Sequence, residues 1–259
     1  MFFILTSCAG KSQNSVSVSF EYSKDSLLVI YKNTLYCPVF SKIENLENNT
    51  VRYIQSEARE TSRLLKFGKI DEDSISILKK YQFEHYYGYH DEKKQSYDTT
   101  YNYGLPYLKG KQYKVIQGYN GSFTHNNEVS RHTIDFKMNI GDTVVATRDG
   151  VVIKVVSHHN KQGTTKKFRP FANYIVIYHS DNTIAQYVHL KQHSNLIKVG
   201  DSVTINQPIG LSGFTGWTTT PHLHFGIFKP TKKGLNSIPI YLNSLEGKTY
   251  KKNKIFKND

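Results

Sequence analysis

Two histidines separated by one residue, His222 and His224, form the first pair whose spacing could do chemistry. Residues i and i+2 of a β-strand project from the same face, so a strand here would place both imidazoles side by side and Leu223 on the other face. Pro221 is compatible with the start of such a strand, where its missing N–H breaks no ladder hydrogen bond. Paired imidazoles can bind zinc, or act as one metal ligand beside one general base. His-x-His is common, so alone it indicates this chemistry only weakly.

The same alternation gives two further side chains a direction. Over residues 184–189 it puts His189 on one face with Tyr187. Asp135 lies between two apolar residues, and a carboxylate on an apolar strand is costly to bury unless it is paired or bound to metal. His125 lies ten residues before Asp135, in a segment rich in Gly, Asn and Ser.

The cysteine count limits the donors that a metal could use. The chain has only Cys8 and Cys37, which excludes a disulfide-dense scaffold and the Cys-rich zinc ligand sets. Any metal must therefore be held by His and carboxylate. Most of the 11 histidines are expected to be ordinary surface or structural residues, including His85, His90, His158, His159, His179 and His193.

The elements that position these side chains are predicted to be mainly β-strands. Short runs of β-branched and aromatic residues alternate with Gly, Asn and Asp, and 3.6-residue periodicity is almost absent. Strand patterns cover residues 17–22, 26–31, 51–55, 61–67, 112–117, 143–147, 151–156, 173–179, 183–190, 202–205 and 222–228. Asp149-Gly150 favours a tight hairpin turn between two of them, 143–147 and 151–156. One helix is predicted near residues 71–81.

The strand patterns and turn residues divide the chain into four segments. Residues 1–15 are a candidate lipoprotein signal remnant and tether, and residues 16–108 a β-sandwich module with immunoglobulin-like strand spacing. Gly and Pro within residues 103–107 precede a fresh strand, so the boundary is placed near 106–110. Residues 109–240 form a compact antiparallel β domain, and 241–259 a basic C-terminal tail. The loop at 157–171 is long, and we interpret it equally as a functional wall or a solvated insertion.

Length and charge exclude some classes of function. The chain has 259 residues and a net charge of +13, which favours an anionic partner: nucleic acid, acidic lipid and wall polymer fit equally. No nucleic acid is expected, because Lys and Arg do not recur at the spacing of a groove-reading helix. No apolar run approaches the roughly 20 residues of a membrane-spanning helix.

The first eight residues suggest a lipid anchor. Leu5-Thr6-Ser7-Cys8 resembles the lipobox of a bacterial lipoprotein signal, although the basic and most of the apolar region of such a signal are missing. Two interpretations stay open, a lipid anchor on Cys8 and an ordinary frayed N-terminus.

Seven ordered blocks carry a resemblance to a known family. They are residues 117–125, 134–136, 147–152, 187–190, 199–201, 209–216 (Ile-Gly-Leu-Ser-Gly-Phe-Thr-Gly) and 221–225 (Pro-His-Leu-His-Phe). Together they resemble the lysostaphin-type zinc endopeptidases over residues 112 to about 229. The order and number of the blocks make the resemblance specific.

The resemblance implies one zinc ion per chain, bound by His125, Asp135 and His224, with His189 and His222 as the catalytic pair. Three protein ligands and an open position are what a hydrolytic zinc requires. His132 is the rival for the first ligand, but on a strand its odd separation from Asp135 sends the two side chains to opposite faces, so we expect His125. One departure from the family's pattern concerns this first ligand: the family often has His-x-x-x-Asp, whereas here the histidine comes from a longer loop before the strand. A second departure is Phe214 at a usually small or polar position, and zinc binding is expected to survive it.

The resemblance also implies a substrate and a location. The substrate would be a stem peptide or cross-link of bacterial peptidoglycan, with both Gly-Gly and D-Ala to meso-diaminopimelate bonds cut in this family. Tyr119, Asn120 and Trp217 are candidate substrate-binding residues, each equally interpretable as packing. The expected location is the bacterial cell envelope, whether periplasmic, anchored as a lipoprotein, or secreted. The alternative is a catalytically silent scaffold that binds peptidoglycan or activates other hydrolases.

Overall fold

The computed structural model describes residues 16–23, 26–67, 76, 79–89, 97–231 and 234–259. It divides into two compact units: unit 1, residues 1–91 and 232–234, and unit 2, residues 92–231 and 235–259. Cys8 and its lipobox-like segment lie outside the described residues, as does most of the predicted helix at 71–81. Within that stretch Ser76 and Lys79 are helical, and Tyr81 begins a strand.

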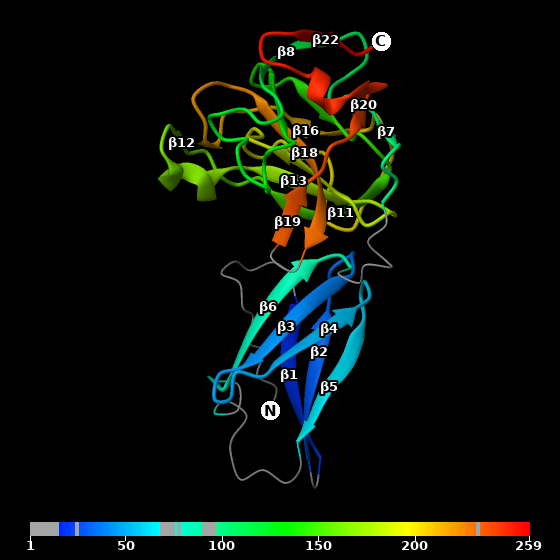
Figure 1. Cartoon of the computed structure of the whole chain (residues 1–259), viewed down its shortest axis with the longest axis vertical. Helices are drawn as coiled ribbons and strands as arrows, with labels where there is room; N and C mark the ends of the chain where they lie inside the picture. The colour runs from blue at the N-terminus through cyan, green and yellow to red at the C-terminus, as the bar shows by residue number, and fades with distance from the viewer. Residues whose placement is uncertain (1–15, 24–25, 68–75, 77–78, 90–96, 232–233) are drawn as a thin grey trace. The chain divides into compact units, whose positions relative to one another are not determined.

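Unit 1 contains two three-stranded antiparallel sheets, ordered β1-β2-β5 and β4-β3-β6 (Figure 1). Their strands are β1 (Val16–Ser23), β2 (Ser26–Asn33), β3 (Val39–Asn45), β4 (Val51–Ser56), β5 (Thr61–Phe67) and β6 (Tyr81–Tyr87). The hydroxyls of Tyr31 on β2 and Ser41 on β3 hydrogen-bond in the interior, which ties one sheet to the other. The sequence patterns found four of these strands but not β3 or β6. The immunoglobulin-like assignment stays a prediction.

Unit 2 is built on a large antiparallel sheet in the order β15-β11-β13-β14-β18-β9-β8-β22, with β19 beside β18 (Figure 1). Its strands are β8 (Gln112–Gln117), β9 (Ile134–Lys137), β11 (Gly150–Val156), β13 (Tyr174–Tyr178), β14 (Ile184–Val188), β15 (Ser202–Val203), β18 (Leu223–Thr231), β19 (Gly234–Ser237) and β22 (Ile255–Lys257). The core contains alternate residues of neighbouring strands, among them Phe136, Ile177, Tyr187 and Phe225. The prediction of a mainly β, antiparallel domain is confirmed.

Smaller sheets complete unit 2. They join β10 (Thr143–Val145) with β16 (Pro208–Leu211), β12 (Gln162–Gly163) with β17 (Gly216–Trp217), and β7 (Asn102–Tyr103) with β20 (Tyr241–Leu242) and β21 (Leu245–Glu246). Two short 3-10 helices, η2 (Lys166–Phe171) and η3 (Gly247–Thr249), lie in connecting segments. The long loop at 157–171 therefore has structure of its own, a short parallel pairing and a six-residue 3-10 helix.

The hairpin predicted at Asp149-Gly150 is wrong. β10 pairs with β16 and β11 pairs with β13 and β15, so the two predicted partners do not pair with each other. The Asp149 carboxylate accepts a hydrogen bond from the backbone N–H of Ile205 at 2.6 Å, and Gly150 pairs with Val203. A dipeptide common in tight turns here serves a contact with a distant loop.

The flanks of the predicted peptidase segment also pack in unit 2. Tyr103, Leu105 and Tyr107 are buried in its core. In the tail, Tyr250 is 1% exposed and β22 pairs with β8. The predicted boundaries at 108/109 and 240/241 thus fall inside one packed unit, because apolar residues on both sides share its core.

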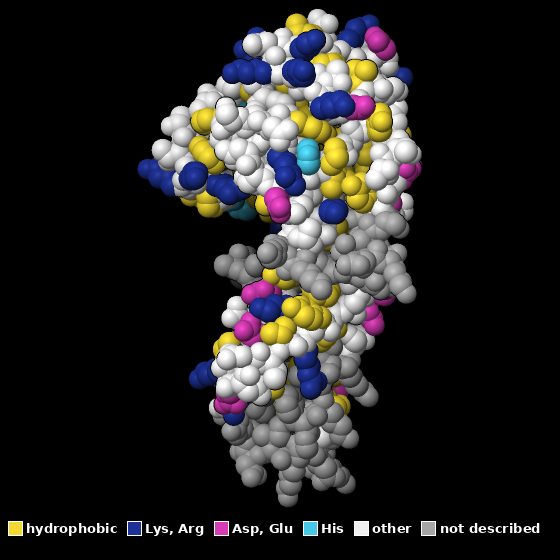
Figure 2. Space-filling view, in the orientation of Figure 1, with side chains coloured by type: hydrophobic (Ala, Val, Ile, Leu, Met, Phe, Trp, Pro, Cys, Tyr) yellow, Lys and Arg dark blue, Asp and Glu magenta, His cyan; other side chains and the backbone are white. Residues whose placement is uncertain are grey.

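Basic side chains are distributed widely. Figure 2 shows Lys and Arg spread over the visible face rather than gathered in one place. In the part of the chain that the structure describes, no helix is long and apolar enough to cross a membrane.

Candidate metal centre

Three polar residues form a row across adjacent strands of the unit 2 sheet. Asp135 on β9 lies opposite Gln117 on β8 and opposite His224 on β18. Cross-strand partners on one face lie about 4.5–5.5 Å apart at Cβ, so the antiparallel pairing alone brings these side chains together. The strand pairing therefore places a carboxylate between an amide and an imidazole.

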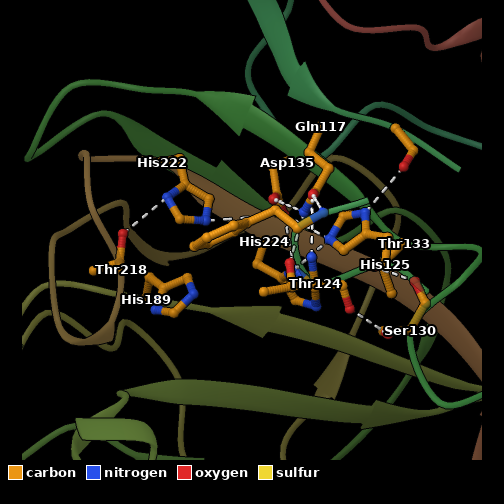
Figure 3. Close-up of polar contacts among 12 residues, drawn as sticks. Gln117, Thr124, His125, Ser130, Thr133, Asp135, His189, Thr218, His222 and His224 are labelled. Carbon is orange, nitrogen blue, oxygen red and sulfur yellow. Dashed lines mark hydrogen bonds and ion pairs between the residues drawn. The ribbon is translucent and has the colours of Figure 1, made fainter. Parts of the chain in front are cut away.

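His125 completes a group of potential ligands with Asp135 and His224 (Figure 3). The Asp135 Oδ1 atom lies 2.8 Å from His224 Nδ1 and 3.3 Å from His125 Nε2, and the two ring nitrogens are 3.4 Å apart. Ligands about 2.1 Å from a tetrahedral zinc lie about 3.4 Å from one another. Two imidazoles and one carboxylate with this spacing fit a divalent zinc ion.

Hydrogen bonds to carbonyl oxygens set the protonation of His125. Its Nδ1–H donates to the Gly118 carbonyl at 3.1 Å, so the Nε2 lone pair is left facing Asp135. A partner of this kind fixes the tautomer of a metal-binding histidine. His224 donates its Nδ1–H to Asp135 at 2.8 Å, and a cation bound by this nitrogen would take the place of that proton.

His189 and His222 lie next to this group with the same arrangement. The Nδ1–H of His189 donates to the Thr215 carbonyl at 2.7 Å, and that of His222 to the Thr220 carbonyl at 2.8 Å. In the neutral form of either ring, Nε2 is therefore the nitrogen without a proton. The His222 Nε2 atom lies 3.9 Å from Asp135 Oδ1, and the rings of His189 and His222 have centroids 4.6 Å apart.

The backbone at His189 differs from the strand alternation that the sequence predicts for residues 184–189. Tyr187 is fully buried in the core, so continued alternation would have sent His189 into the core as well. Instead β14 ends at Val188, and His189 has a φ of 67°. This left-handed backbone turns the side chain out of the strand pattern and beside His222.

Burial and mutual proximity shift the pKa values of the group. Burial alone would raise the pKa of Asp135, but His222, His224 and the hydrogen bond from His224 hold it well below its usual value. Burial lowers the pKa of His189 to about 3, helped by His222 and His224. Burial also lowers the pKa of His224, against the opposing effect of Asp135. A carboxylate held in its ionised form beside imidazole nitrogens is ready to receive a cation.

The segment that carries His125 is well anchored. His125 is 0% exposed, its backbone N–H bonds the Gly121 carbonyl at 3.0 Å, and Ser130 Oγ donates to the Thr124 carbonyl at 2.6 Å. The rival His132 precedes β9, and its Nδ1–H donates to the Ser237 carbonyl at 2.9 Å. The structure thus places His125 in the group and His132 outside it.

The three candidate substrate-binding residues lie in different settings. Tyr119 packs edge-on against His132, and its hydroxyl accepts from the Ile240 N–H, so the structure does not bring it to the metal group. Asn120 is exposed in a turn with a φ of 56°. Trp217 is half-buried, and its indole N–H donates to the Thr164 carbonyl at 3.0 Å.

Several site neighbours escaped the sequence analysis. Phe123, two residues before His125, is 63% exposed and has its ring 6.0 Å from that of Trp217. Thr215 and Thr220 act through backbone carbonyls, which no side-chain pattern can reveal. Thr218 Oγ1 lies 3.2 Å from His222 Nδ1.

Comparison with known proteins assigns this unit to a family. Residues 129–237 match the family described as peptidase family M23. The chain contains an M23 peptidase domain. The matched segment includes Asp135, His189, His222 and His224, whereas His125 lies just before it. The resemblance to the lysostaphin-type peptidases is confirmed.

Relatives of the M23 domain are found among curated proteins. The chain is 33% identical over 157 residues to an uncharacterized metalloprotease of Buchnera aphidicola, covering 57% of this chain and 38% of that protein. It is 41% identical over 92 residues to peptidoglycan DD-endopeptidase ShyA of Vibrio cholerae, covering 35% and 18%. It is 35% identical over 114 residues to lysostaphin of Staphylococcus simulans, covering 44% and 21%. The chain thus spans 18% to 38% of the length of these relatives.

Proposed function

We propose that the M23 domain is a zinc-dependent endopeptidase that hydrolyses amide bonds in peptidoglycan stem peptides or cross-links, in cell wall remodelling or lysis. The observation that carries the proposal is the group of His125, Asp135 and His224 with two further imidazoles beside it. Three ligands that leave one position open, next to acid–base groups, are the requirement of a hydrolytic metal site.

In this proposal His125 Nε2, an Asp135 oxygen and His224 Nδ1 hold one zinc ion per chain. Zinc supplies Lewis-acid polarisation of the scissile carbonyl and lowers the pKa of water to about 7. The Gly118 carbonyl keeps the Nε2 lone pair of His125 available. Asp135 offsets part of the positive charge.

His222 and His189 supply the proton transfers. In its neutral form each ring has a free lone pair on Nε2, because its Nδ1–H is engaged by a carbonyl. His222 would take the proton of the attacking water as general base. His189 would stabilise the developing oxyanion or pass a proton to the leaving amine, in either role after taking up a proton at Nε2 from solvent water. Exchange of these two roles is the alternative assignment.

The substrate class is supported by the relatives and by charge. ShyA and lysostaphin relatives make peptidoglycan the proposed substrate, and a net charge of +13 favours an anionic wall polymer. Trp217 and the exposed Phe123 are the proposed substrate contacts beside the metal group, with Asn120 at the loop before them. Tyr119 would have a structural role, through its packing against His132.

The silent scaffold is the less favoured function. Members of a fold that serve only as binding partners need not keep metal ligands or acid–base groups. All five polar side chains are present and gathered here, so nothing in the site favours that alternative.

The proposed location is the bacterial cell envelope, with Cys8 as a lipid attachment point. The support is the lipobox-like Leu5-Thr6-Ser7-Cys8 together with a wall substrate. Intact-mass analysis of the protein extracted from membranes is expected to show a diacylglyceryl addition that Cys8→Ser abolishes. An unmodified mass in that fraction would remove the anchor from the proposal.

The enzymatic proposal is tested by dye release from labelled sacculi. The full chain should release dye, a chelator should stop the release, and added zinc should restore it. Two kinds of sacculi show which bond is cut. One kind is cross-linked through D-Ala to meso-diaminopimelate, and the other has glycine bridges. No release from either kind, by protein that holds zinc, would overturn the endopeptidase assignment.

A further inference from the structure

The side-chain amide of Gln117 has all its hydrogen-bonding positions occupied. Its Nε2 atom donates to Asp135 Oδ2 at 3.1 Å and to Thr124 Oγ1 at 2.6 Å. Its Oε1 atom accepts from the backbone N–H groups of Phe123 at 3.2 Å and Thr124 at 3.3 Å. An amide offers two donors and two acceptor sites, and here each is used. One side chain therefore joins the Asp135 carboxylate to the segment that carries His125 (Figure 3).

These contacts allow only one orientation of the amide. If the amide were turned over, its oxygen would face the Asp135 carboxylate and its NH2 group would face two backbone donors. The carboxylate in turn has a defined rotation, because Oδ2 is bound by Gln117 while Oδ1 faces the histidines. Gln117 thus determines which oxygen is presented to His125 and His224.

The His125 segment closes tightly over Gln117. A Cβ atom placed on Gly121 would lie 2.3 Å from Gln117 Cγ, far inside van der Waals contact. Gly121 also accepts the backbone N–H of His125 at its carbonyl. The conformation of the turn from Gly121 to His125 therefore depends on where the Gln117 side chain lies.

We propose that Gln117 is a positioning residue that presents Asp135 and His125 jointly to the metal ion. The proposal rests on the metal site of the proposed function and assigns to Gln117 no contact with substrate. Partners that orient metal ligands typically change metal affinity by about 10–100-fold when removed. Loss of the amide should free the rotation of the carboxylate and loosen the His125 turn together.

The test compares full-length Gln117→Met with Gln112→Met, a control on the same strand at an exposed position. Methionine keeps the length of the side chain and removes its donors. Competition with a chromogenic chelator should show the zinc Kd raised about tenfold or more in Gln117→Met and unchanged in the control. The visible spectrum of the cobalt(II)-loaded protein reports ligand geometry, and it should change only in Gln117→Met.

Three outcomes decide the matter. A zinc Kd within about twofold of the wild type, with the same cobalt spectrum, overturns the role of Gln117. A wild-type protein that takes up no zinc overturns this proposal and the proposed function together. If Gln117→Met does not fold, Gln117→Asn replaces it: its amide is one methylene shorter and cannot reach both partners, so its zinc Kd should also rise, and a wild-type Kd again overturns the proposal.

Discussion

The proposed acid–base histidine and the proposed ligand histidine should respond differently to alanine substitution. His222→Ala removes an Nε2 that faces the centre but no proposed ligand, so turnover should fall about a hundredfold or more while zinc stays bound. His224→Ala removes a ligand, so zinc itself should be lost. Kinetics on a defined peptide and metal content by atomic absorption check the pair. Near wild-type turnover in His222→Ala would remove it from the mechanism.

What the sequence could predict at this scale depends on whether a residue follows strand alternation. His224 and Asp135 lie on strands, where side-chain direction follows from position, and His222 directly precedes β18; the family resemblance identified all three. His189 lies near them only because a left-handed φ interrupts the alternation, and no pattern encodes that. Gln117 lies opposite Asp135 through a strand pairing, which the sequence alone does not specify.

At the scale of elements, the pairing of β12 with β17 holds Trp217 in place, and Gly216 is its most sensitive position. Gly216 has a φ of 84°, and a Cβ there would lie 2.7 Å from Ala172 Cα, just after η2. Gly216→Ala should therefore cost more than the roughly 1–3 kcal/mol of backbone strain alone. It should also raise the KM for peptidoglycan fragments with zinc retained.

Gly110→Ala is the matched control. Gly110 also has a positive φ, 78°, but nothing lies within 4 Å of its added Cβ. Urea unfolding of the two variants should show the larger loss in Gly216→Ala, and only that variant should change KM. Equal losses and an unchanged KM would mean that the packing of β17 beside η2 does not position Trp217 for substrate.

The sequence predicts strands that have a clear local pattern. It does not predict which strands pair when the partners are far apart in the chain. β5 and β8 match their predicted ranges because each is a short run that includes β-branched or aromatic residues. The Asp149-Gly150 turn failed because Asp149 bonds Ile205, which lies 56 residues away. Tertiary contact here overrides a local turn preference.

For the whole molecule, acid sensitivity is expected from a buried neutral histidine. His179 is 0% exposed, and burial lowers its pKa to about 3, with Arg148 adding to the effect and Asp181 opposing it. The unfolded chain would bind this proton near pH 6.5. Stability is therefore full above about pH 6.5 and falls as the pH drops toward 3, by up to about 1.4 kcal/mol per pH unit.

Urea unfolding of the metal-free protein across pH 4–7 measures this slope. His179→Asn keeps a donor toward Thr183 and removes the titration, so its free energy of unfolding should depend less steeply on pH. His193→Asn, at an exposed position with a φ of 51°, should keep the wild-type slope. Identical slopes in all three proteins would contradict the assignment.

The proposed ligands come from distant parts of the chain, which links zinc supply to the lifetime of the protein. His125 and His224 are 99 positions apart and Asp135 and His224 are 89 apart, so an unfolded chain holds no ready-made site. Zinc at a hundred times its Kd would add about 2.7 kcal/mol to the folded state. Without that zinc the unfolded fraction of the chain would be about a hundred times larger, which exposes more of the protein to proteolysis.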